Sequence, residues 1–132
     1  FGCPVNFRPS DSGIDVVIHS ATKYLSGHSD LIAGAVAGTE DVIDQVTRMS
    51  RLYGPALDPH AAWLLDRGIR TLDARMTRHN ENALSRATWL SEQAGIQTVI
   101  YPGLDTHPDH VLASELMVGW GGMAYIRDQS PD

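Results

Sequence analysis

One short polar stretch combines residue types that could do covalent chemistry. It reads His19-Ser20-Ala21-Thr22-Lys23-Tyr24 and follows the apolar run Ile14–Ile18. A lysine just beyond a buried strand can lie where water is scarce, and desolvation favours the neutral amine that forms a Schiff base. The hydroxyls of Ser20 and Thr22 flank Lys23 and suit a phosphate group. These residues are what a pyridoxal-phosphate site needs, although a solvated lysine in a polar loop fits them as well.

The elements around this stretch predict an α/β fold. The runs Ile14–Ile18 and Leu31–Gly38 indicate buried strands, the first in a parallel sheet. Lys23 then falls in a loop beyond a strand end, which is the edge where open α/β sheets bind ligands. Thr39 is expected to cap one helix, and the pair Asp58-Pro59 is expected to begin another.

The second half of the sequence changes character. A helix is expected from about Ile69 to Ala94, with His79 packed on its apolar stripe. Trp63 and Leu64 of the preceding helix are expected to pack inward. A strand, a helix and a strand should follow; their expected ranges are Thr98–Tyr101, Pro108–Met117 and Met123–Ile126. We therefore expect residues 1–74 to be the C-terminal part of one domain, and residues 75–132 to be a linking helix and the start of another.

The composition excludes several classes of function. The 132 residues carry 10 Lys+Arg and 16 Asp+Glu, a net charge of −6, which disfavours a nucleic-acid surface. No apolar run is long enough to span a membrane. Cys3 is the single cysteine, so no intrachain disulfide can form and a reducing cytoplasmic location is expected. The sequence begins at Phe1 without an initiator Met, and we expect it to be an internal piece of a longer protein.

Several polar residues have a structural explanation as well as a functional one. His28 and Asp30 could support the Lys23 loop in catalysis, but local hydrogen bonds that fix the loop are favoured. His107 and His110 could present two imidazoles on one helix face. Pro108 lies between them and indicates the start of a surface helix, so no metal site is predicted.

The order of motifs resembles a known enzyme family. Lys23 lies in the run VVIHSATKYLSGHSDLIAGAVAG, which is similar to the cofactor-lysine segment of the trans-sulfuration enzymes. This family includes cystathionine γ-synthase, the cystathionine lyases, methionine γ-lyase and O-acylhomoserine sulfhydrylase. Later segments are also similar to the family, in its order: LDPHAAWLLDRGIRTLDARMTRHNENA, YPGLDTHPDH and GWGGMAYI.

The resemblance implies the fold, the cofactor and the roles of individual residues. The fold would be part of the fold type I pyridoxal-phosphate-dependent transferase fold, namely the end of the large domain and the start of the C-terminal α/β domain. Lys23 would be catalytic and would hold pyridoxal 5'-phosphate. Ser20 and Thr22 would bind the cofactor phosphate. Phe1 would match the aromatic residue that follows the family's Asp-Asn-Thr motif.

The reaction implied by the resemblance is γ-replacement or γ-elimination on cystathionine or homoserine esters. Two alternatives are β-elimination of the cystathionine β-lyase type, and a non-catalytic remnant that serves as a binding or assembly module. The partners would be a small amino-acid substrate and further copies of the parent protein in a homotetramer. The family's ring-stacking Tyr, pyridine-pairing Asp and carboxylate-binding Arg lie outside this sequence, so the chain alone is expected to be inactive.

Overall fold

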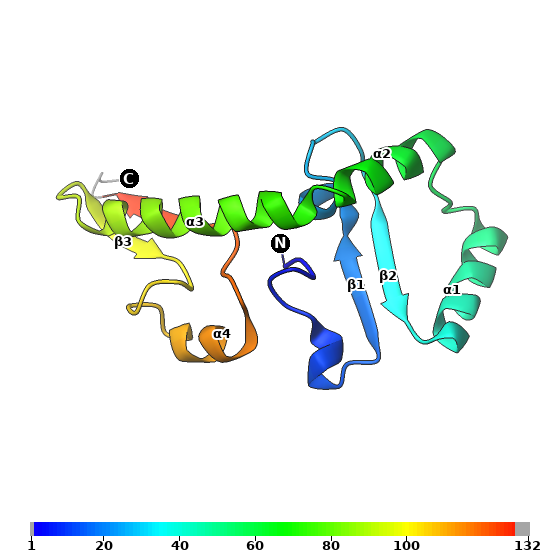
Figure 1. Ribbon diagram of the computed structural model, residues 1–132, viewed down its shortest axis with the longest axis horizontal. Helices are drawn as coiled ribbons and strands as arrows, with labels where there is room; N and C mark the ends of the chain where they lie inside the picture. The colour runs from blue at the N-terminus through cyan, green and yellow to red at the C-terminus, as the bar shows by residue number, and fades with distance from the viewer. Residues whose placement is uncertain (1, 129–132) are drawn as a thin grey trace. The chain divides into compact units, whose positions relative to one another are not determined.

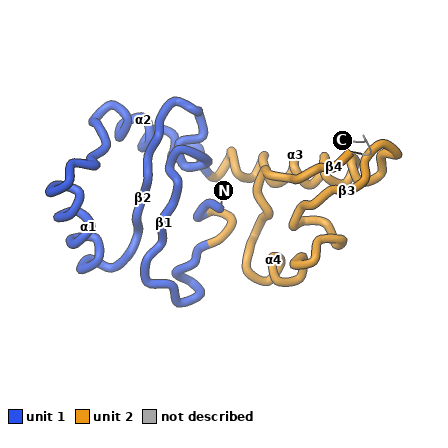
Figure 2. Tube along the Cα trace, turned by 180° about the vertical axis from the view of Figure 1, so that it is seen from behind, with its two compact units in different colours: residues 1–4, 8–72 blue, residues 5–7, 73–132 orange. Residues whose placement is uncertain are grey.

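The computed structural model describes residues 2–128, which form two compact units (Figures 1 and 2). Unit 1 contains residues 2–4 and 8–72, and unit 2 contains residues 5–7 and 73–128. The elements of unit 1 are the short helical turn η1 (Pro9–Ser12), β1 (Val16–Ser20), the π-type turn η2 (Ala21–Leu25), β2 (Gly34–Gly38), α1 (Glu40–Tyr53) and α2 (Pro59–Ile69). The helix α3 (Leu72–Ser91) begins at the boundary, and β3 (Ile96–Ile100), α4 (His110–Leu116) and β4 (Tyr125–Asp128) follow in unit 2.

The sheet of unit 1 differs from the parallel arrangement predicted from the sequence. β1 and β2 are antiparallel, and Val16 pairs with Gly38 while Ser20 pairs with Gly34. A parallel pair needs a crossover that returns the chain to the starting end, whereas the connection between these strands turns directly back. The prediction of buried strands was also wrong, because β1 alternates exposed and half-buried residues and Ile18 is 76% exposed.

The predicted helix starts of unit 1 are confirmed. Thr39 stands at the N-cap position of α1, although its side chain makes no capping hydrogen bond. Asp58 caps α2 by accepting hydrogen bonds from the backbone N–H groups of His60 (3.0 Å) and Ala61 (3.1 Å). The expected inward packing of Trp63 is wrong, since this side chain is 57% exposed. Its ring instead stacks with His60 and lies near the guanidinium of Arg67.

The buried face of α3 carries a polar residue where an apolar one was expected. Leu72, Met76 and Ala87 are buried, whereas His79 is exposed, so its prediction as a packed histidine was wrong. Asn80, four residues after Met76, is half-buried and holds the inward position. A spacing of four follows one helix face as well as a spacing of three does, and the apolar pattern alone could not choose between His79 and Asn80.

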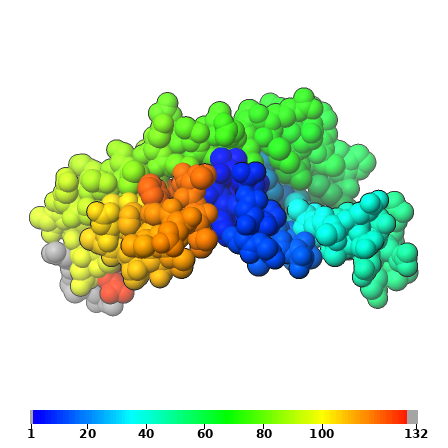
Figure 3. All heavy atoms as spheres, turned by 60° about the horizontal axis from the view of Figure 1, so that its bottom comes forward, coloured from blue at the N-terminus to red at the C-terminus, as the bar shows by residue number. Residues whose placement is uncertain are grey.

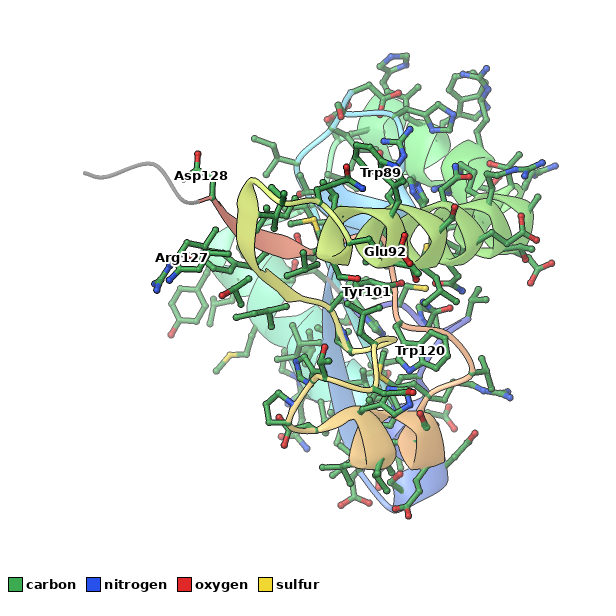
Figure 4. All side chains as sticks on the ribbon, turned by 90° about the vertical axis from the view of Figure 1, so that its left-hand side faces the viewer. Trp89, Glu92, Tyr101, Trp120, Arg127 and Asp128 are labelled. Carbon is green, nitrogen blue, oxygen red and sulfur yellow. The ribbon has the colours of Figure 1, made fainter. Side chains whose placement is uncertain are left out.

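Unit 2 is centred on buried Tyr101. β3 pairs antiparallel with β4, so that Ile100 lies opposite Tyr125. Tyr101, which is labelled in Figure 4, is fully buried. Its hydroxyl donates a 2.8 Å hydrogen bond to the carbonyl of Gly121. On the face shown in Figure 3, the residues between β3 and β4, coloured yellow to orange, pack into one continuous mass.

A reciprocal amide pair joins three segments of unit 2. Asn6 Nδ2 donates to Asn80 Oδ1, and Asn80 Nδ2 donates to Asn6 Oδ1, each over 2.9 Å. Asn80 Oδ1 also accepts from the backbone N–H of Gly121, and the Asn6 carbonyl accepts from the N–H of Val118, again over 2.9 Å. Since Asn6 is only 3% exposed, its amide depends on these partners rather than on water.

None of the helices described between residues 2 and 128 combines the length and the apolar character needed to cross a bilayer.

Removing the Asn80 side chain should destabilise unit 2. Asn80→Ala leaves the buried Asn6 amide and the Gly121 N–H without their partner, and we expect a loss of about 1–3 kcal/mol in the free energy of unfolding. Asn82→Ala, on the exposed part of the same helix, is the matched control and should change it by less than about 0.5 kcal/mol. Denaturant unfolding of the protein measures both, and equal losses would contradict a special role for the amide pair.

Candidate cofactor site

Lys23 lies immediately beyond the end of β1. Ser20 is the last residue of the strand, and the turn η2 begins at Ala21. Lys23 departs from helical geometry, with φ −90° and ψ −119°, so the turn is interrupted at this residue. The hydrogen bond from Ser26 N–H to the Ala21 carbonyl (2.9 Å) closes the turn around it. Lys23 is exposed among the described residues, and it is the only lysine in the sequence.

The side chain of Thr22 is tied to the far side of the turn. Its Oγ1 accepts from the Ala33 N–H over 2.9 Å and donates to the Ala33 carbonyl over 3.3 Å, while the Thr22 N–H also donates to that carbonyl over 3.2 Å. The β1–β2 register would place Ala21 opposite Ala33. A side-chain hydroxyl therefore takes over a backbone position of the ladder, and the chain is free to leave the extended path before Lys23.

The residues after Lys23 form a closed hydrogen-bonded loop. Ser26 Oγ donates to Asp30 Oδ1 over 3.1 Å, and His28 Nδ1–H donates to the Ser26 carbonyl over 2.7 Å. The prediction that His28 and Asp30 serve local hydrogen bonding is confirmed. Gly27 and Ser29 both have positive φ values, 75° and 59°, which lets the loop fold back so tightly.

The two predicted phosphate ligands differ in how available they are. Ser20 is exposed, and its hydroxyl has no hydrogen-bond partner among the described residues. The single hydroxyl hydrogen of Thr22 is already directed to the Ala33 carbonyl. Of these two hydroxyls, only that of Ser20 can donate to a further acceptor without breaking a bond, whereas Thr22 would have to give up its bond to the Ala33 carbonyl.

Two residues that sequence reasoning missed hold this turn. Ser26 is 1% exposed, and Gly68 of α2 lies against its carbonyl. No pattern in the sequence links Gly68 to the turn of Lys23, because the two lie more than 40 residues apart. Phe1, expected to match an aromatic residue of the site, lies outside the described residues.

The remaining candidates have local partners. His110 Nδ1–H donates to the Pro102 carbonyl over 2.8 Å, and its Nε2 lies 3.3 Å from Asp105 Oδ1. His107 Nδ1 accepts from the Asp109 N–H over 3.1 Å. Cys3 is buried, as expected for a small packing residue. Among residues 2–128, no group of three or more His, Cys, Asp and Glu side chains is arranged to hold a metal ion.

Comparison with known proteins matches almost the whole chain to one family. The family model described as Cys/Met metabolism PLP-dependent enzyme matches residues 1–129. Cystathionine gamma-synthase of Mycobacterium leprae is 41% identical over 96% of this chain and 33% of its own length. Cystathionine beta-lyase of Coxiella burnetii is 42% identical over the same two shares. The chain therefore spans about a third of the length of these relatives.

The fold is likewise shared with solved structures. The crystal structure of cystathionine gamma synthase from Xanthomonas oryzae pv. oryzae, in complex with aminoacrylate and cysteine, has a TM-score of 0.94 and 39% identity. It is matched over 98% of this chain and 34% of that one. Cystathionine gamma-lyase from Lactobacillus plantarum, complexed with L-serine, has a TM-score of 0.93 and 37% identity.

These matches confirm the predictions of family, partial α/β fold, enzyme class and cofactor that the sequence motifs led to. The family model matches residues 1–129 of the chain. The cofactor named in its description is the one predicted from Lys23 and the neighbouring hydroxyls. The chain belongs to the pyridoxal-phosphate-dependent enzymes of cysteine and methionine metabolism.

Proposed function

We propose that this chain is part of a trans-sulfuration enzyme in which Lys23 holds pyridoxal phosphate. The observation that carries the proposal is the placement of the chain's only lysine in the turn η2, directly after β1, whose last residue is Ser20 with its exposed hydroxyl. Unit 1 would belong to the large cofactor-binding domain, and unit 2 would begin the smaller C-terminal domain.

The residues around Lys23 have different roles in the proposed binding of the cofactor. Ser20 Oγ donates a hydrogen bond to the cofactor phosphate, and a bond to a charged acceptor is stronger than a neutral one. Thr22 primarily holds the turn through Ala33 and adds a second phosphate contact when its hydroxyl is turned outward. The Ser26–Asp30 bond and the His28 bond keep the turn in place while the side chain of Lys23 moves.

Lys23 has a second role as a proton carrier. When bound, pyridoxal phosphate supplies an electron sink for negative charge on the substrate α-carbon. The neutral amine of Lys23 would take the proton from the substrate α-carbon and would deliver it to another atom of the substrate. An exposed, unbranched side chain of this length can reach successive positions without movement of its backbone.

The relatives support the proposed class of substrate. We assign γ-replacement or γ-elimination on cystathionine or homoserine esters, because the family matches include γ-synthases and a γ-lyase. β-Elimination from cystathionine is the second candidate, since the Coxiella burnetii β-lyase is 42% identical and the Mycobacterium leprae γ-synthase 41%. The homotetrameric assembly and the cytoplasmic location stay predictions.

Borohydride should trap the cofactor on Lys23 in the longer protein. Because the chain has no other lysine, a modified peptide from residues 1–132 must carry the label at this position. Lys23→Arg keeps the positive charge but cannot supply a neutral amine, and it should abolish both the yellow colour and the label. Peptide mapping by mass spectrometry is the measurement, and labelling of a lysine outside this chain would refute the assignment.

Substitutions at Ser20 should affect cofactor binding, whereas substitutions at Thr22 should affect stability. Ser20→Ala should weaken cofactor binding about 10- to 100-fold, the worth of a hydrogen bond to a charged group, with little effect on unfolding. Thr22→Val should cost about 1–3 kcal/mol of stability, because Ala33 loses its side-chain partner. Thr22→Ser keeps the hydroxyl and is the control. Equilibrium dialysis measures cofactor binding, and thermal unfolding measures stability. An unchanged stability of Thr22→Val would contradict the proposed role of the Thr22–Ala33 hydrogen bonds.

The 132-residue chain expressed by itself should associate and should lack turnover of cystathionine and homoserine esters. Ile18 and Ile32 are 76% and 87% exposed, and apolar side chains exposed beside an open strand promote contacts between chains. The double variant Ile18→Thr, Ile32→Lys should associate less. Light scattering and release of 2-oxo acid are the readouts, and sustained turnover by a monodisperse chain would rule out the proposed need for further residues.

A further inference from the structure

The helix α2 lies close against the segment that follows Lys23. Gly68 is buried near the end of α2, and a methyl group built on it would collide with the Ser26 carbonyl oxygen. The same methyl group would lie 3.1 Å from both the carbonyl carbon and the Cα of Ser26. These are backbone atoms, which cannot rotate aside as a side chain can, so any larger residue would have to displace the segment itself.

Ser26 is the residue through which the turn is assembled. Its N–H donates to the Ala21 carbonyl (2.9 Å), its Oγ donates to Asp30 (3.1 Å), and its carbonyl accepts from His28 (2.7 Å). The neighbouring N–H of Gly27 donates to the carbonyl of Lys23 itself over 2.8 Å. A shift of the Ser26 backbone would therefore move Lys23, because the bonds from Ser26 N–H to the Ala21 carbonyl and from Gly27 N–H to the Lys23 carbonyl connect the two segments.

We infer that Gly68 is a positioning residue for Lys23: the absence of a side chain at this point of α2 sets where the Ser26 backbone lies, and with it the origin of the lysine side chain. The inference rests on the proposed function, since it concerns the lysine that would hold the cofactor. Gly68 contacts neither substrate nor cofactor in this assignment and acts only through Ser26.

Helix propensity predicts whether Gly68→Ala should raise or lower the stability of α2 in the absence of a collision. Alanine is favoured over glycine inside a helix, so Gly68→Ala would stabilise α2 if the position had room. A collision with backbone reverses this expectation. If Gly68→Ala lowers both the trapping at Lys23 and the stability, the cause is the collision with the Ser26 backbone and not a change in helix propensity.

The test compares three glycine variants of the longer protein. Gly68→Ala carries the predicted effect. Gly103→Ala is also crowded, since its methyl group would meet the rings of Tyr101 and Trp120 at 2.7 and 2.8 Å, but it belongs to unit 2. Gly95→Ala has no atom within 4 Å and serves as the neutral control. Each variant is measured for thermal unfolding, for the dissociation constant of pyridoxal phosphate, and for the fraction of Lys23 trapped by borohydride.

We expect Gly68→Ala and Gly103→Ala to lower the unfolding temperature, and only Gly68→Ala to reduce trapping at Lys23 and to weaken cofactor binding, by about tenfold or more. Displacements on the order of 1 Å at a reacting group have effects up to about 100-fold. Equal losses of trapping in both variants would overturn the inference, as would normal trapping in Gly68→Ala. Absence of trapping in the unaltered protein and in Gly95→Ala would instead refute the proposed function.

A second variant decides the matter where Gly68→Ala does not fold. His28→Ala removes the bond to the Ser26 carbonyl without adding bulk, and it should reduce trapping at Lys23 in the same direction but less. Asp11→Ala, on the exposed turn η1, is its control. Unchanged trapping in His28→Ala would show that the Ser26 backbone does not position Lys23, and the inference would fall.

Discussion

The double hydrogen bond between the Thr22 hydroxyl and the backbone of Ala33 is the contact on which the candidate site depends. It ends the β1–β2 ladder by replacing a backbone partner with a side chain. A threonine can do this because its hydroxyl both donates and accepts. The pairing of the two strands stops at Ser20 and Gly34, and the turn that contains Lys23 begins directly after Ser20. The position of the lysine is thus a consequence of where the ladder stops.

The sequence predicted the elements of the fold better than their arrangement. The cap at Thr39 and the cap-proline pair at Asp58 marked helix starts correctly, because capping depends on residues that are neighbours in the chain. The direction of β2 was missed, since an apolar run indicates a strand but carries no information about its partner. The exposure of Trp63 was missed for a related reason, because the inward face of a helix is set by what packs on it.

The site shows the same division between local and distant contacts. Lys23, Ser20 and Thr22 could be proposed together because they fall within one short stretch that resembles a family motif. Their spacing, combined with the family motifs, was enough to predict the cofactor. Gly68 and Asn80 were not found, since each acts on residues that are far away in sequence. A glycine in a helix and an asparagine between apolar positions both look like ordinary surface choices until the opposing backbone is known.

The amide pair of Asn6 and Asn80 has a consequence for how unit 2 responds to its surroundings. Neither group titrates near neutral pH or carries a net charge, so the contact is insensitive to ionic strength, unlike the exposed ion pair of Asp66 and Arg70. The pair also has a single allowed orientation, because Asn80 Oδ1 must face two donors at once. Rotating either amide by half a turn would place oxygen against oxygen and nitrogen against nitrogen. The two side chains therefore fix the position of the segment around Asn6 on α3 in a single orientation.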